Sequence, residues 1–446
     1  MTAGLRWHAG LGWGGIVRLG LVQAAIGAIV MLATSLLNRV MVVEFALPAA
    51  LPAGLVAWHY AVQLSRPVWG HGSDRGRRRT PWIVGGMAAL SGGALVAVWA
   101  VGVIASGSRA GYGLAIIAFA LIGAGVGAAG TSLLAMLATH VAPPRRAPAA
   151  AVTWIMMVLG IVVSAAVAGR LIDPFSFTRL VSVVAGVAGV AFAVATLAAW
   201  RVEPLETRPI ERLPAPAPRF AEALGDMWAD PDARRFTVFV FLSMLAYSMQ
   251  DLILEPFAGL RFGLTPGQST QMSSVQHGGV LAGMILAGVG GSAFGGRTAT
   301  GLRQWIVAGC VGSALALAGL ALAARVGPGW PIVGNVFALG FANGVFAVSA
   351  IGAMMALAGG GADAAGGDPG REGLRMGVWG AAQAVAFGLG GLIGAVAVDA
   401  GRAVGGSLAE TFMLVFGTEA LLFLVAAAMS LRTEPRGVHF ARGVTL

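Results

Sequence analysis

The chain of 446 residues is 57% hydrophobic and only 11% charged, and its mean hydropathy of +0.81 exceeds what a soluble domain could hide in one core. All 29 basic residues are arginine, but they are spread among short loops, which excludes the basic face of a nucleic-acid-binding protein. The single cysteine, Cys310, excludes an intramolecular disulfide and a thiolate metal site. We therefore expect the lipid bilayer, and no nucleic acid, as a partner.

Twelve apolar stretches, most of them roughly 20 residues long, follow one another along the chain, and each could cross about 30 Å of hydrocarbon as a helix. They predict an all-α membrane protein with 12 transmembrane helices. The first stretch leads into further spans without a cleavage site, so we expect a permanent helix there. The predicted spans centre near Gly27, Val56, Gly93, Gly123, Leu159, Val190, Leu245, Gly283, Leu315, Leu339, Gly388 and Glu419.

The long loop after the sixth span divides the chain into two six-helix halves. Residues 1–200 form the predicted N-terminal half, residues 201–234 a linker rich in proline and charge, and residues 235–446 the C-terminal half. Arginines gather in alternate loops, and the positive-inside rule places those loops, the linker and both termini in the cytoplasm. Two halves of six spans match a major-facilitator architecture, in which the halves work around a midplane cavity.

Polar residues recur in a similar pattern toward the predicted outer ends of the first and seventh spans. These residues are Asn38, Arg39, Glu44, Gln250, Asp251 and Glu255. Asp251 and Glu255 are four residues apart and so share a helix face. We hypothesise that Arg39 and Asp251 form an ion pair between the halves that holds the outer side closed. The alternative is that these are solvated charges at the membrane surface.

Glu419 falls near the centre of the twelfth apolar stretch. A charged residue inside the bilayer is costly and usually faces protein, water or a ligand. Its functional interpretations are a proton carrier and a polar anchor for a ligand. The structural alternative is a protonated or hydrogen-bonded contact between helices.

Two of the six histidines, His59 and His277, lie within predicted spans. A neutral imidazole inside a membrane could be the axial ligand of the magnesium in a chlorophyll-type pigment. A hydrogen bond between helices is the plainer alternative for each. No spacing of metal ligands and no nucleophile, base and orienter set occurs, so we predict neither a metal site nor a catalytic site.

The loop between the second and third spans runs Gly70-His-Gly-Ser-Asp74-Arg75-Gly-Arg-Arg78-Arg79. It is similar to the loop signature of the major facilitator superfamily. In that family, glycine permits a tight turn, the aspartate caps or pairs with a neighbouring helix end, and the arginines hold the cytoplasmic gate. Here the second glycine of the motif comes one residue early, and Arg77 stands where it is usually found.

Four strings, at residues 12–19, 37–44, 77–82 and 249–256, together resemble the PucC and LhaA group, the bacteriochlorophyll-delivery branch of the major facilitator superfamily. The likeness extends over both halves, and relatives in the group include one described as a bacteriochlorophyll synthase chain. The resemblance implies that the protein handles bacteriochlorophyll or a late precursor as bound cargo, at the inner (intracytoplasmic) membrane of a purple phototrophic bacterium. It also implies antenna polypeptides, and bacteriochlorophyll synthase, as partners.

Three functions remain open on the sequence. The leading one is a non-enzymatic factor that delivers bacteriochlorophyll for the assembly of light-harvesting complexes. The second is a proton-coupled transporter of a small solute, in which Glu419 or Asp251 binds the proton. The third is an accessory chain of bacteriochlorophyll synthase; against catalysis stands the lack of paired acidic motifs that bind a magnesium diphosphate.

Overall fold

The computed structural model describes residues 11–66, 69, 73, 78–142, 145–203, 225, 228–229, 231–293, 299–359 and 372–432. All regular structure within these residues is helical. The helices of the N-terminal half are α1 (Trp13–Met31), η1 (Leu32–Leu36), α2 (Leu37–Arg39), η2 (Val40–Glu44), α3 (Ala50–Gln63), α5 (Thr80–Ala105), α6 (Ala110–His140), α7 (Arg146–Leu171) and α8 (Phe177–Ala199). Those of the C-terminal half are α10 (Pro231–Phe262), α11 (Pro266–Ala293), α12 (Ala299–Val326), α13 (Ile332–Gly359), α14 (Glu372–Ala403) and α15 (Leu408–Arg432).

Among the described residues, eleven helical segments are long and apolar enough to span a membrane. The first of them runs without a break from Trp13 through η2 to Glu44. The second predicted span corresponds to α3, whose 14 residues rise only about 21 Å. Each predicted span centre lies within one helix, and the predicted all-α, twelve-helix membrane fold is confirmed.

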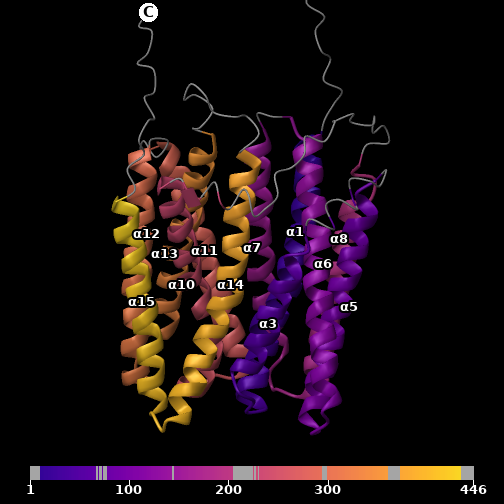
Figure 1. The fold of residues 1–446 in the computed structure, drawn as a ribbon. Helices are drawn as coiled ribbons and strands as arrows, with labels where there is room; N and C mark the ends of the chain where they lie inside the picture. Colours follow the sequence, from indigo (N-terminus) through magenta and orange to yellow (C-terminus); the bar gives the residue numbers. More distant parts are fainter. Residues whose placement is uncertain are drawn as a thin grey trace, which may run out of the picture.

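The helices stand side by side in two groups, with the N-terminal helices (indigo to magenta) on the right of Figure 1 and the C-terminal helices (orange to yellow) on the left. The same pairs of helices pack in each group. In the N-terminal half, α1 packs on α7 and α8, and α5 packs on α6 and α8; in the C-terminal half, α10 packs on α14 and α15, and α12 packs on α13 and α15. Because matching positions make matching contacts, the two halves are structural repeats.

The contacts between the halves follow the same symmetry. Helix α7, fifth in its half, packs on α11, second in the other, while α3, second in its half, packs on α14, fifth in the other. The segments η1, α2 and η2 pack on α10, so the first helices of the two halves also meet. Such reciprocal contacts are those of a pseudo-two-fold axis along the bundle, as in parallel repeats of major-facilitator proteins.

Buried apolar residues form one core in each half. The larger cluster lies between residues 11 and 202 and includes only Leu252 and Ala395 from the C-terminal half. The second lies entirely between residues 236 and 427. A small third cluster, formed by Val158, Val280 and Met284, lies between α7 and α11. The apolar contact between the halves is thus limited, which leaves polar groups to determine how they fit.

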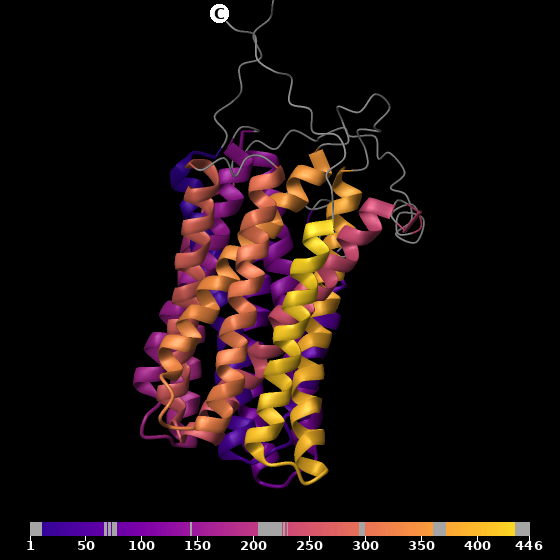
Figure 2. The ribbon, with the colours of Figure 1, turned by 90° about the vertical axis from the view of Figure 1, so that its left-hand side faces the viewer.

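The two ends of the bundle differ. At one end, here called the near end, α1 begins and α15 ends; it is uppermost in Figures 1 and 2. At the far end, η2 ends and α15 begins. Of the predicted cytoplasmic loop motif, Gly70, Asp74 and Arg75 lie outside the described residues, while Arg78 is exposed. Most of the predicted linker, residues 201–234, also lies outside them.

Glycine allows close approach between α11 and α13. A Cβ atom at Gly283 would overlap the carbonyl oxygen of Phe341, and one at Gly340 would overlap the carbonyl oxygen of Gln276. Gly288, also on α11, faces open space. Small residues are how membrane helices bring their backbones together.

We expect Gly283→Ala to destabilise the C-terminal half by about 1–3 kcal/mol, because the added methyl group must push two backbones apart. Gly288→Ala is the matched control on the same helix and should leave stability unchanged. Thermal unfolding of the two purified variants in detergent checks this. Equal melting temperatures for both would show that the α11 and α13 contact tolerates separation.

Candidate functional site

The first helix reaches the inter-half interface through two π-helical segments, η1 and η2. A π turn widens the helix by one residue and often occurs at functional sites. Residues five apart on a regular α-helix point about 140° away from each other, but Arg39 and Glu44 meet here. The π turns therefore bring together polar side chains that a regular α-helix would separate.

Arg39 is buried, and each of its guanidinium nitrogens has a partner. Its Nη1 pairs with Glu44 Oε1 at 2.5 Å, its Nε donates to Ser269 Oγ at 3.0 Å, and its Nη2 donates to the carbonyl oxygen of Leu264 at 2.7 Å. Ser269 and Leu264 belong to the C-terminal half. The hypothesis that Arg39 pairs with Asp251 is wrong, because Glu44 is its acidic partner. Arg39 nevertheless joins the two halves.

Glu255, on α10, forms a second polar contact across the interface. Its Oε1 accepts hydrogen bonds from Ser35 of η1 and from Ser273 of α11, the latter at 2.5 Å. One turn beyond Ser35, Asn38 donates through Nδ2 to the carbonyl oxygen of Leu252 at 2.7 Å. Glu255 is buried, so moving the halves apart would take these hydrogen-bond donors away from its carboxyl group. The loss would cost free energy, and the bonds therefore stabilise the contact between the halves.

Two aspartates cap helices of the opposite half. Asp173 accepts from the Thr265 hydroxyl at 2.5 Å and from the Gly267 amide at 3.1 Å, at the start of α11. Asp399 accepts from the amides of Ala49 and Ala50, at 3.0 and 2.7 Å, at the start of α3. Carboxylates are favoured at helix N-termini, where amide groups have no partner within the helix. With the Arg39 contacts, these caps fasten the far end of the bundle.

A cavity of about 600 Å³ lies at the far end between the halves, and Arg39, Glu44, Asp173, Phe175 and Thr265 are among the residues that line it. The basic and acidic groups facing it are already paired with protein groups. The far-end cavity therefore lies among the polar contacts that join the two halves.

Asp251 lies on α10, as predicted for the seventh span. It lies past the midpoint of the helix, toward the far end, and α10 continues through Pro256 to Phe262. Proline is tolerated inside membrane helices because neighbouring groups can satisfy the freed carbonyl. Asp251 interacts electrostatically with Tyr60 of α3 and Tyr247 of α10.

An aromatic group connects the halves beside Asp251. The ring of Phe387, on α14, lies 5.8 Å from that of Tyr60 and 5.7 Å from that of Tyr247, centroid to centroid. These are ordinary distances for aromatic packing. The contact between α3, α10 and α14 is thus aromatic with one acidic side chain, unlike the hydrogen-bonded far end.

The two histidines differ in what they offer. His59 is buried, and its Nε2 lies 2.7 Å from Nε2 of Gln63 on the next turn of α3, with Nδ1 unpartnered. His277 is half-buried on α11, and its Nδ1 lies 2.9 Å from the carbonyl oxygen of Ser273. Such a bond fixes the proton on Nδ1 and leaves Nε2 as the free electron-pair donor. His277 is therefore the better placed of the two for a ligand.

Gln250 and Glu419 lie away from the interface. Both are fully buried inside the C-terminal half, and their side-chain polar atoms have no hydrogen-bond partner in the part of the chain that the structure describes.

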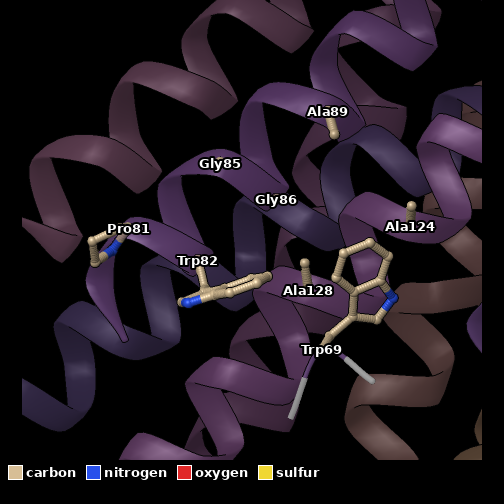
Figure 3. Close-up of a pocket in the computed structure, with 8 residues that line it drawn as sticks. All are labelled: Trp69, Pro81, Trp82, Gly85, Gly86, Ala89, Ala124 and Ala128. Carbon is tan, nitrogen blue, oxygen red and sulfur yellow. The ribbon is translucent and has the colours of Figure 1, made fainter. Parts of the chain in front are cut away.

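An apolar groove opens on the outside of the N-terminal half near the near end (Figure 3). It encloses about 290 Å³ between Trp69, the first turns of α5 and the facing part of α6. Trp82 and Trp69 form one end, with ring centroids 6.2 Å apart and planes at 60°. The remaining lining is small or flat: Pro81, Gly85, Gly86, Ala89, Ala124 and Ala128.

The groove is held open by its own residues. The indole N–H of Trp69 donates to Ser65 Oγ at 2.9 Å, which fixes the ring against the end of α3. Gly86 allows α5 to lie close to α6, because a Cβ atom at this position would lie only 2.6 Å from the Ala129 amide nitrogen. Pro81 and Gly85 are exposed, so the groove faces what surrounds the bundle.

The sequence prediction missed several of these residues. Asp173, Ser269 and Ser273 carried no signal, because single polar residues at helix ends are common. Trp82 lies within a string that carries the family resemblance, but no pattern joined it to Trp69.

We expect Arg39→Gln to loosen the far end, because it leaves Glu44 and the Leu264 carbonyl without their partner; breaking a buried pair costs about 3–5 kcal/mol. The measurement is the rate at which a membrane-impermeant maleimide labels Ser273→Cys in a Cys310→Ala background. The rate should rise at least tenfold.

Arg261→Gln is the matched control for this measurement. Arg261 also lies at the far end, but it donates to the carbonyl oxygens of Ala324 and Arg325 within its own half. Its loss should not change the labelling rate. Equal rates in both variants would mean that Arg39 does not hold the halves together.

Two solved structures share this fold. A peptide transporter POT in complex with sulfate aligns with a TM-score of 0.67 at 14% identity, covering 96% of both chains. A bacterial homologue of the human lysosomal transporter Spinster, in an inward-facing and unoccupied conformation, aligns with a TM-score of 0.68 at 15% identity, covering 94% of this chain and 96% of its own. These likenesses concern the fold alone.

Relatives in sequence are much closer. The bacteriochlorophyll synthase 44.5 kDa chain of Rhodobacter capsulatus is 50% identical over 434 residues, 97% of each chain. Protein PucC of Rhodobacter capsulatus is 30% identical over 441 residues, 95% of this chain and 92% of its own. The model of the PUCC protein family matches residues 36–436, from Leu36 in η1 to beyond the end of α15. A match across both six-helix halves means that the chain is a member of the PUCC protein family.

Proposed function

We propose that this protein is a non-enzymatic membrane factor that receives bacteriochlorophyll, or a late precursor, and passes it to newly inserted antenna polypeptides during assembly of light-harvesting complexes. The observation that carries the proposal is the 50% identity, over 97% of the chain, to a protein named as a chain of bacteriochlorophyll synthase. Membership of the PUCC protein family supports the same role. The expected setting is the inner, intracytoplasmic membrane of a purple phototrophic bacterium.

The apolar groove beside Trp69 and Trp82, here called the tryptophan groove, supports handling of a flat, apolar ligand. Indole rings bind other π systems by offset or edge-to-face contact, and the small residues beside them leave a face free of side chains. A groove of about 290 Å³ is at the lower limit of a small-molecule pocket. It could hold one edge of a macrocycle while the rest, with its isoprenoid tail, stays in lipid. Such partial contact favours lateral transfer over storage.

The proposed orientation places the near end in the cytoplasm. The loops at this end hold most of the arginines, including Arg78, Arg79 and Arg145, whereas the far end carries isolated ones such as Arg109 and Arg402. The positive-inside rule then puts both termini and the tryptophan groove on the cytoplasmic side. Bacteriochlorophyll synthase is the partner expected at this side.

The groove's role is tested by pigment retention. Protein purified gently from pigment-containing membranes should carry bacteriochlorophyll, and Trp82→Ala should lower the pigment-to-protein ratio by up to about tenfold through loss of aromatic contact. Trp99→Ala is the matched control, since Trp99 is on the same helix, is 65% exposed and lies outside the groove. Absorption spectra of equal amounts of protein give the ratio. An equal ratio in both variants would remove the groove from the proposal.

Deleting the gene distinguishes a role in pigment delivery from a role in pigment synthesis. We expect antenna complexes to fall severalfold while extractable bacteriochlorophyll and its precursors change little, because delivery acts after synthesis. Absorption spectroscopy of membranes and of solvent extracts measures both. Purified protein supplied with chlorophyllide and a prenyl diphosphate should form no product. Normal antenna in the deletion strain, or prenylated product in the assay, would contradict the proposal.

A further inference from the structure

Four helices of the C-terminal half each bury a polar side chain. These residues, here called the polar cluster, are Gln250 of α10, Ser313 of α12, Asn343 of α13 and Glu419 of α15, and all four are fully buried. Buried polar residues inside a membrane bundle are costly unless they bind one another or something else.

Contacts between phenylalanine rings indicate where the polar cluster lies along the length of the bundle. Toward the far end, the ring of Phe257 on α10 lies 4.9 Å from that of Phe412 and 5.0 Å from that of Phe416, both on α15. Toward the near end, the ring of Phe346 on α13 lies 6.0 Å from that of Phe423 on α15 and 6.4 Å from that of Phe239 on α10.

The helical register then places the polar residues between these two aromatic layers. Gln250 precedes Phe257 by two turns and so lies on the same face of α10. Glu419 falls between Phe416 and Phe423 on the face of α15 that they share. Asn343 lies one turn before Phe346 on α13. Aromatic rings thus lie on the far-end side and on the near-end side of the polar cluster.

The hydrogen bonds of the polar cluster are incomplete. Ser313 donates to Asn343 Oδ1 at 2.7 Å. Asn343 Nδ2, both polar atoms of the Gln250 amide and both carboxyl oxygens of Glu419 have no partner among the described residues. Buried donors and acceptors are thus left over in the polar cluster, which is the condition for a bound water or proton.

A neutral carboxylic acid fits this set of groups. Its hydroxyl can donate to the Gln250 oxygen, while its carbonyl oxygen can accept from an amide of Gln250 or Asn343, directly or through one water. An ionised carboxylate would lie buried with no basic side chain paired to it among the described residues. We propose that Gln250, Asn343 and Glu419 form a proton-binding site within the C-terminal half, with Glu419 carrying the proton.

Asp251 connects this site to the inter-half interface. Helices α10, α12 and α14 pack on α15, and their titratable residues in the described part include Asp251 and Tyr247 on α10, Cys310 on α12 and Asp399 on α14. Asp251 interacts electrostatically with Glu419 and, across the interface, with Tyr60. Asp399 already caps α3 at the far end. Asp251 is therefore the titratable residue whose charge acts on both Glu419 and the interface.

Infrared spectroscopy of the purified, full-length protein in lipid nanodiscs tests the site. At neutral pH the wild type should show the C=O stretching band of a protonated carboxyl group, shifted by exchange into D₂O. Glu419→Gln should remove this band and keep the melting temperature, because glutamine replaces a neutral acid of the same shape. Glu410→Gln, which changes an exposed carboxylate on the same helix, should leave the band unchanged.

Gln250→Met keeps the test decisive if Glu419→Gln fails to fold. It removes one hydrogen-bonding partner and should move the band to higher frequency without abolishing it. A wild type without the band, or a band that survives Glu419→Gln, would overturn the proposal. So would stabilisation of the wild type, but not of Glu419→Gln, by sodium chloride over choline chloride, which would indicate a cation site.

Discussion

Hydrocarbon offers no hydrogen bonds to a peptide backbone, so a chain within it must pair its amides and carbonyls internally. Helices meet this requirement one at a time, and the described regular structure is helical throughout. The same requirement removes water as a partner for polar side chains. A polar group inside the bundle is costly unless it finds a partner in the protein, and the partners that are found determine how the helices fit together. The halves share little apolar core, so these polar contacts fix their relative position.

The first helix shows how a local irregularity creates such contacts. Its π segments turn Ser35, Asn38 and Arg39 toward α10 and α11 and bring Glu44 back to Arg39. The resulting bonds lie at the far end, where Asp173 and Asp399 also cap helices of the opposite half. At the middle of the bundle, the contact between halves is aromatic, through Tyr60, Tyr247 and Phe387. Among the described residues, the hydrogen bonds between the halves thus gather toward the far end.

The architecture of a transporter does not by itself decide between transport and delivery. Transport across the membrane needs a route between the halves, whereas a pigment that dissolves in lipid needs only a surface along the bundle. The tryptophan groove is such a surface, since it opens outward between α5 and α6 and holds no charged lining residue. The polar cluster around Glu419 is buried within one half. The two features could therefore serve one protein in different ways, one for an apolar cargo and the other for a proton.

The sequence by itself determined the membrane fold, the twelve helices and their division into halves, because length and apolar composition follow directly from the thickness of hydrocarbon. It also identified most polar residues that matter, since charge within a span is rare. It could not determine their partners. Arg39 meets Glu44 only because of a π turn, Phe387 contacts both Tyr60 and Tyr247 only because α3, α10 and α14 lie together, and Trp69 meets Trp82 only because the first turn of α5 lies beside it. Contacts between residues far apart in the chain depend on how helices pack, and packing is decided by tertiary structure.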